Sequence, residues 1–156
     1  MSVKPMSVLV KICGLKTPDA LDAALAAGAD LVGFVFFAPS PRHVASFETA
    51  RELGARVNGE AGKVALTVDA DDATFEQIVA SLKPDMLQLH GKETPERVTA
   101  LKKKFGLPVM KAIAVETKAD LGAIATYAAV ADRLLFDARA PREASHSPRM
   151  RSDRPS

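Results

Sequence analysis

Five side chains able to transfer protons or bind anions lie at or near the ends of short apolar stretches in this 156-residue chain. They are Cys13, Arg42, Asp69, His90 and Asp137. Cys13 follows the first such stretch and stands just before Thr17-Pro18-Asp19, which has the residue types of a helix start. If the stretches are parallel strands, their carboxyl ends share one edge, which is where α/β barrels place their chemistry.

Each of these residues also has an ordinary structural role that the sequence alone leaves open. A single cysteine such as Cys13 is often a small buried apolar residue. His90 could bond a loop carbonyl, Asp69 and Asp137 could cap helices, and Arg42 could be a solvated loop charge.

Lys111 interrupts the apolar run Val109–Ala114. A lysine in the middle of a buried strand usually points to a binding site or to a carboxylate. One cysteine and dispersed histidines offer no metal-ligand spacing, so the sequence predicts no metal site.

Six apolar runs, starting 22 to 33 residues apart, predict the strands that position these side chains. The runs are Val8–Ile12, Leu31–Phe36, Val64–Val68, Met86–Leu89, Val109–Ala114 and Leu134–Phe136. Most are continuously apolar rather than alternating, which is typical of parallel strands buried on both faces.

Helical patterns fill the five intervals between these runs. The predicted helices are Pro18–Ala27, Phe47–Val57, Ala73–Leu82, Pro95–Phe105 and Lys118–Ala129. Repeated βα units build either an open sheet or a closed barrel. No glycine-rich nucleotide-binding turn follows the first strand, and the regular unit length favours a barrel, although a (β/α)8 barrel needs eight units and this chain supplies six.

Several short motifs together resemble one family, the phosphoribosylanthranilate isomerases of tryptophan biosynthesis. In chain order these motifs are Lys11–Gly14 (KICG), Phe34–Phe37 (FVFF), Ser40–Arg42 (SPR), Leu87–Gly91 (LQLHG) and Leu135–Ala138 (LFDA). The resemblance covers roughly residues 8–145 and implies a (β/α)8 TIM barrel.

The resemblance also implies an activity, the Amadori rearrangement of N-(5-phosphoribosyl)anthranilate to an aminoketose, without cofactor or metal. It implies that Cys13 is the general base and Asp137 the general acid. Arg42 matches a position near the anthranilate carboxylate, and His90 matches one lining the substrate site. Asp69 and Lys111 are expected near the bound substrate, without an assigned chemical role.

The chain departs from the family pattern from His146 onward. We expect residues 1–145 to form a partial barrel and residues 146–156 to be a disordered basic tail, as after a truncation or frameshift. Expected consequences are open strand edges, self-association and little activity of this chain alone. Two alternatives remain: another phosphosugar barrel such as indole-glycerol-phosphate synthase, and a non-enzymatic remnant.

Charge and composition exclude other classes of protein. Residues 138–156 carry a net charge of +3, so the remaining residues carry −1. These remaining residues offer no basic face that would indicate nucleic-acid binding. No apolar run is long enough to span a membrane. One cysteine suits a reducing compartment, and we expect a cytoplasmic protein whose partner is a small phosphosugar-anthranilate substrate.

Overall fold

Six strands alternate with helices in the computed structural model, which describes residues 7–138. The strands are β1 (Lys11–Cys13), β2 (Leu31–Phe36), β3 (Gly62–Thr67), β4 (Met86–Leu89), β5 (Val109–Val115) and β6 (Arg133–Ala138). The α-helices are α1 (Pro18–Ala26), α2 (Phe47–Val57), α3 (Asp72–Leu82), α4 (Pro95–Phe105) and α5 (Ala123–Ala128).

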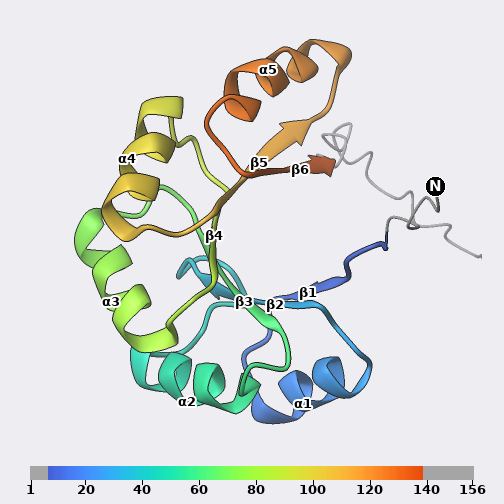
Figure 1. The fold of residues 1–156 in the computed structure, drawn as a ribbon, viewed down its shortest axis with the longest axis vertical. Helices are drawn as coiled ribbons and strands as arrows, with labels where there is room; N and C mark the ends of the chain where they lie inside the picture. The colour runs from blue at the N-terminus through green and yellow to red at the C-terminus, as the bar shows by residue number, and fades with distance from the viewer. Residues whose placement is uncertain (1–6, 139–156) are drawn as a thin grey trace, which may run out of the picture.

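The six strands form one parallel sheet in the order β1-β2-β3-β4-β5-β6. The sheet is curved, with the helices along its outer side, and β1 and β6 are its two edge strands (Figure 1). The predicted class, a barrel of the (β/α)8 type with six βα units, is confirmed for the described residues. The predicted boundary between residues 145 and 146 lies outside them.

Side-chain caps explain where the helices begin. Thr17, Ser46, Asp71 and Thr94 each accept a hydrogen bond from the backbone N–H three residues ahead, which satisfies a donor that the helix itself leaves unpaired. Three helices end at a residue in the left-handed conformation, at Asn58, Lys83 and Gly106.

The larger part of the core lies between the sheet and the helices. Phe34, Leu87 and Leu89 from the strands pack there with helix residues that include Leu53 and Phe75. A smaller cluster, Val64, Met86 and Met110, fills the inner side of the curved sheet. Because successive strand residues point to opposite faces, β3, β4 and β5 each supply residues to both clusters.

Two elements differ from the sequence predictions by more than small shifts of their ends. The first strand begins at Lys11, and residues Val8 to Val10 before it are exposed. The region predicted as one helix over 118–129 is a 3₁₀ turn, Lys118–Gly122, followed by the short α5. In that turn the Asp120 carboxylate accepts hydrogen bonds from the backbone N–H groups of Glu116 and Thr117.

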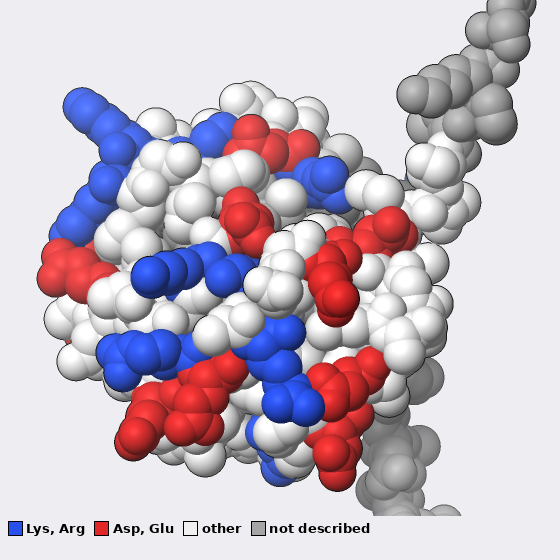
Figure 2. Space-filling view, turned by 60° about the horizontal axis from the view of Figure 1, so that its bottom comes forward, with Lys and Arg blue, Asp and Glu red and all other residues white. Residues whose placement is uncertain are grey.

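Cationic and anionic side chains are interleaved on the face of the molecule seen in Figure 2. Arg56 of α2 and Asp22 of α1 form one of the ion pairs between neighbouring helices, at 2.6 Å. Their hydrogen bond holds the pKa of the exposed Asp22 carboxyl below its ordinary value. Among residues 7–138, no helix has the length and apolar character needed to cross a membrane.

Candidate active site

An open cavity of about 620 Å³ lies at the carboxyl ends of the strands. Its lining includes four of the six side chains singled out from the sequence: Cys13, Arg42, His90 and Asp137. A second cavity of about 360 Å³ adjoins it, because Val68, His90 and Asp137 line both, and Asp69 lines this second one. The parallel topology therefore brings together residues that lie up to 124 positions apart in the chain.

Cys13 is the last residue of β1 and is half-buried, with a free thiol. It lies opposite Gly33 of β2 in the sheet register. A Cβ atom on Gly33 would come within 2.7 Å of the Cys13 sulfur, so a side chain there would push the thiol aside. Glycine at this strand position leaves room for the thiol beside the cavity.

Arg42 lies in the loop that follows β2, and its side chain packs across Gly14. Gly14 has a φ of +85°, and a Cβ atom there would come within 2.5 Å of the Arg42 side chain. Gly14 therefore permits both the turn after β1 and the close approach of the arginine. The Arg42 guanidinium forms no ion pair within residues 7–138, which leaves its planar fork available to an anion.

His90 joins the candidate acid Asp137 to the interior of the sheet. One imidazole nitrogen, Nε2, lies 2.9 Å from Oδ2 of Asp137, and the other, Nδ1, lies 3.1 Å from Nε2 of Gln88. The alternative role of His90 is wrong, because its ring nitrogens contact side chains rather than a loop carbonyl. Asp137 lies within β6, and the residues that it could cap lie outside those that the structure describes.

Asp69 does not cap the helix that follows it, because Asp71 performs that role. Asp69 instead has a φ of +49°, and its carboxylate accepts a hydrogen bond of 2.8 Å from the backbone N–H of Lys92. Its own N–H donates to Oε2 of Glu93 at 2.9 Å. These two bonds tie the loop after β3 to the loop after β4.

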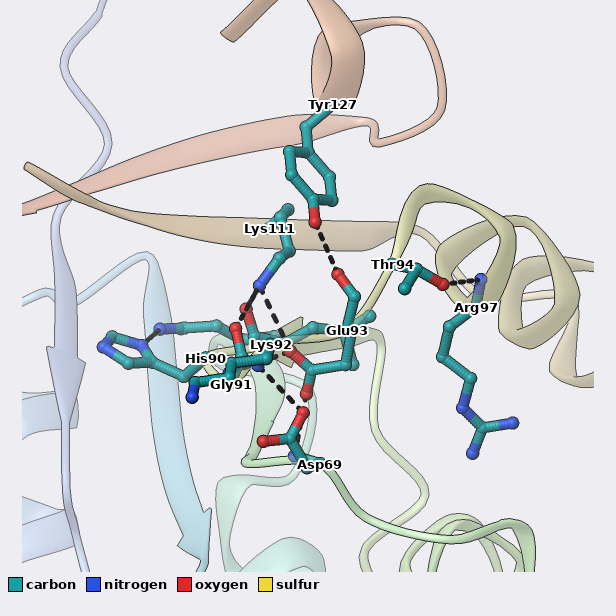
Figure 3. A network of polar contacts seen from close by, with 11 residues as sticks. Asp69, His90, Gly91, Lys92, Glu93, Thr94, Arg97, Lys111 and Tyr127 are labelled. Atoms are coloured by element: carbon teal, nitrogen blue, oxygen red, sulfur yellow. Dashed lines mark hydrogen bonds and ion pairs between the residues drawn. The ribbon is translucent and has the colours of Figure 1, made fainter. Parts of the chain in front are cut away.

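Lys111 does not line either cavity. Its ammonium group lies behind the site, 3.1 Å from Glu93 Oε1 and 2.7 Å from the carbonyl oxygen of Gly91, and both charged side chains are 3% exposed. Figure 3 shows Lys111 and Tyr127 approaching Glu93 from the same side, while the imidazole of His90 points away from them. Of the two sequence interpretations of Lys111, a binding site or a carboxylate, the structure supports the carboxylate.

Glu93 is the buried residue that joins the contacts of Lys111 to those of Asp69, and the sequence analysis did not identify it. Its carboxylate accepts from Lys111 and from the backbone N–H groups of Asp69 and Gly91. The Tyr127 hydroxyl donates to the Glu93 carbonyl oxygen at 2.7 Å. Burial, together with the negative charge of Glu93, raises the pKa of that phenol. Glu93 thus holds both loops that carry the cavity residues Asp69 and His90.

Replacing Lys111 with methionine is expected to lower the free energy of unfolding by about 3–5 kcal/mol, because it leaves the Glu93 carboxylate buried without its cation. Urea denaturation followed by circular dichroism measures this loss. Lys103→Met, at an exposed position on α4, is the matched control and is expected to change stability by about 0.5 kcal/mol or less. Equal losses in the two variants would show that the buried pair contributes little.

Within residues 7–138, no group of three or more His, Cys, Asp or Glu side chains is arranged to hold a metal ion.

Comparison with known proteins identifies relatives of this chain. A family model described as N-(5'phosphoribosyl)anthranilate (PRA) isomerase matches residues 10–146. The N-(5'-phosphoribosyl)anthranilate isomerase of Bradyrhizobium sp. (strain ORS 278) is 67% identical over 140 residues, which are 90% of this chain and 64% of that relative.

Solved structures agree with the sequence matches. The phosphoribosyl anthranilate isomerase of Thermotoga maritima superposes with a TM-score of 0.79 at 27% identity, over 86% of this chain and 63% of that one. A phosphoribosyl anthranilate isomerase in complex with reduced 1-(o-carboxyphenylamino)-1-deoxyribulose 5-phosphate gives a TM-score of 0.78 at 27% identity, over 85% and 66% of the two chains. This chain therefore spans less than two thirds of the length of these relatives.

Proposed function

We propose that this chain carries the acid–base machinery of an N-(5'-phosphoribosyl)anthranilate isomerase, because it belongs to that family. The reaction is the Amadori rearrangement of the aminoaldose N-(5-phosphoribosyl)anthranilate to the corresponding aminoketose, a step in tryptophan biosynthesis. The observation that carries the proposal is that Cys13, Arg42, His90 and Asp137 line one cavity at the carboxyl ends of the strands.

Asp137 is proposed as the general acid. Its carboxyl group gives a proton to the ring oxygen of the sugar while the C1–O bond breaks, which opens the ring to a protonated Schiff base. Asp137 Oδ2 is held by His90. The other oxygen, Oδ1, can therefore carry the proton that is transferred.

Cys13 is proposed as the general base. Its thiolate removes the proton from C2 of the Schiff base, and the electron pair of that C–H bond forms an enolamine. The enolamine then becomes the ketone by moving the proton of its hydroxyl group to C1. These reaction steps transfer protons and break one C–O bond, and they involve no net oxidation or reduction.

Arg42 and Asp69 are proposed as substrate-binding residues. The guanidinium of Arg42 suits the anthranilate carboxylate, because a planar fork can donate two parallel hydrogen bonds. Asp69 and His90 border the adjoining cavity and are placed to meet the sugar. Lys111, which the sequence suggested as a binding residue, is proposed to act indirectly by holding Glu93 and the two loops.

The chain is also proposed to self-associate through its edge strands. Within the described residues β1 and β6 each pair on one side only, and each carries an exposed apolar side chain, Ile12 on β1 at 39% and Phe136 on β6 at 54%. Such edges can pair with another chain. The single thiol supports a cytoplasmic location.

Two proteins test the proposed function: residues 1–156 alone, and a chimera in which residues 1–138 continue into the Bradyrhizobium relative from the position that follows the one aligned with residue 138. Loss of the fluorescent anthranilate substrate reports turnover, and size-exclusion chromatography reports association. The chimera is expected to turn over substrate, and the chain alone is expected to associate and to show negligible turnover.

The proposed activity and the expected inactivity of the chain alone would be contradicted by different results. A folded chimera without activity would overturn the proposed function. A monomeric 156-residue chain that turns over at about 1 to 1,000 per second, as enzymes typically do, would instead overturn the expectation that the chain alone is inactive.

A further inference from the structure

A row of polar side chains crosses the inner side of the sheet and ends at the candidate acid. Lys11 Nζ on β1 lies 2.5 Å from Gln88 Oε1 on β4, and Gln88 Nε2 lies 3.1 Å from His90 Nδ1. His90 Nε2 in turn lies 2.9 Å from Asp137 Oδ2 on β6. Lys11 and Gln88 have no role in the chemistry described so far.

Gln88 is the middle member of this row, and its side chain is fixed at both ends. It is 1% exposed, and it lies among apolar strand residues where an amide is retained only if its polar atoms are bonded. The ammonium group of Lys11 can donate hydrogen bonds but cannot accept them. The amide oxygen of Gln88 must therefore face Lys11, and its NH₂ group must face His90.

The orientation of the amide decides which imidazole nitrogen carries the proton. An NH₂ group facing His90 Nδ1 can only donate, so Nδ1 must offer a lone pair. The neutral ring then carries its hydrogen on Nε2, which donates to Oδ2 of Asp137. A ring protonated at Nδ1 would place its N–H against the NH₂ group of the buried Gln88 amide, so that two donors face each other without an acceptor.

We propose that Lys11 and Gln88 are positioning residues that hold His90 as its Nε2–H tautomer. In this state one oxygen of Asp137 is occupied by His90, and the other is left to exchange a proton with a substrate. The assignment of the tautomer rests on the hydrogen bonds alone. Its consequence for catalysis rests on the proposed function.

Gln88→Glu tests the tautomer directly, because it replaces the NH₂ donor with a carboxylate oxygen of nearly the same shape. Long-range ¹H–¹⁵N spectra of the ¹⁵N-labelled 156-residue chain report which ring nitrogen of each histidine is protonated. His90→Asn identifies the His90 signals. Solid-state spectra of the sedimented chain supply the same nitrogen shifts if the protein self-associates.

In the parent protein, Nδ1 of His90 is expected to be unprotonated and Nε2 protonated. In Gln88→Glu, Nδ1 is expected to become protonated. Gln77→Glu, which makes the same chemical change at an exposed position on α3, is the matched control and is expected to leave His90 as in the parent. A parent ring protonated at Nδ1, or a ring that is unchanged in Gln88→Glu, would overturn the proposal.

Lys11 supplies a second, independent test. In Lys11→Met the amide loses the donor that orients it, so a mixture of His90 tautomers is expected. Lys11→Arg restores a group that can only donate, and it is expected to restore the single tautomer. A purely space-filling role for Lys11 predicts no change of tautomer in either variant, and that result would contradict the proposal.

The catalytic consequence is measured in the active chimera. Gln88→Glu is expected to lower kcat by at least about tenfold. The loss is expected not to exceed the whole contribution of a general acid, which is roughly 10²–10⁴-fold. Gln77→Glu is expected to leave kcat unchanged. If the chimera is folded but inactive, the proposed function fails while the spectra still decide the tautomer. If kcat is unchanged in an active Gln88→Glu chimera, the positioning role fails.

Discussion

Asp137→Asn in the chimera is expected to lower kcat by about 10²–10⁴-fold, the usual contribution of a general acid. Asparagine keeps the shape of the side chain and can still accept the hydrogen bond from His90 through its amide oxygen. It has no acidic proton to give to the sugar ring oxygen, so ring opening is the step that fails. Loss of substrate fluorescence at saturating concentration measures the effect.

The control for this prediction is Asp19→Asn, which makes the same change at an exposed position in the first turn of α1. It is expected to leave kcat unchanged. A circular dichroism spectrum equal to that of the parent shows that each variant is folded. If Asp137→Asn stays active over a range of pH, the acid is another group, and His90, at 2.9 Å from the same carboxylate, is the next candidate.

The arrangement of strands and helices could be predicted because local residue signals and tertiary packing agree. The runs Leu31–Phe36 and Met86–Leu89 and the helices Phe47–Val57 and Pro95–Phe105 have the predicted bounds. Thr17, in the predicted helix start, caps α1 as expected. In these elements apolar periodicity, caps and turn residues all favour the same structure.

The placement of the cavity residues could also be predicted, because it depends only on the parallel direction of the strands. Any polar residue at the carboxyl end of such a strand lies at the same edge. Cys13, His90 and Asp137 satisfy this rule by position alone, without knowledge of their contacts. Their catalytic roles stay predictions.

The supporting contacts could not be predicted, because they depend on distances between residues far apart in the chain. Lys111 required a carboxylate, but the sequence holds 19 acidic residues and no local pattern selects Glu93. Gln88 carries the same signal as Lys111, because it is a polar residue inside an apolar strand. Gly33 inside β2 is a third signal, since glycine in a strand often marks a close approach.

The proposed catalytic pair places a particular demand on the fold. Cys13 lies on β1 and Asp137 on β6, and these are the two edge strands of the described sheet. Within residues 7–138 the edge strands that carry the proposed base and acid are joined by the four strands between them and by the side-chain row from Lys11 to Asp137. Their separation therefore depends on the curvature of the whole sheet, and a proton-transfer site requires accurate placement of both groups. The chimera tests whether additional chain fixes that curvature.

Cys13→Ser in the chimera is expected to lower kcat by about 10²–10⁴-fold, the usual contribution of a general base, with little change in KM. A serine hydroxyl has nearly the same size as the thiol and fits the space beside Gly33. It is far less acidic than a thiol, so almost no alkoxide is present near neutral pH to remove the proton from C2 of the sugar.

Chemical modification provides the control for this last prediction, because Cys13 is the only cysteine in the chain. A chimera joined to a cysteine-free version of the added segment has one thiol, and alkylation of that thiol by iodoacetamide is expected to abolish turnover. A product analogue bound in the cavity is expected to slow the alkylation, since Cys13 lines that cavity. Near-normal turnover in Cys13→Ser, or full activity after complete alkylation, would remove Cys13 from the mechanism and require another base in the cavity.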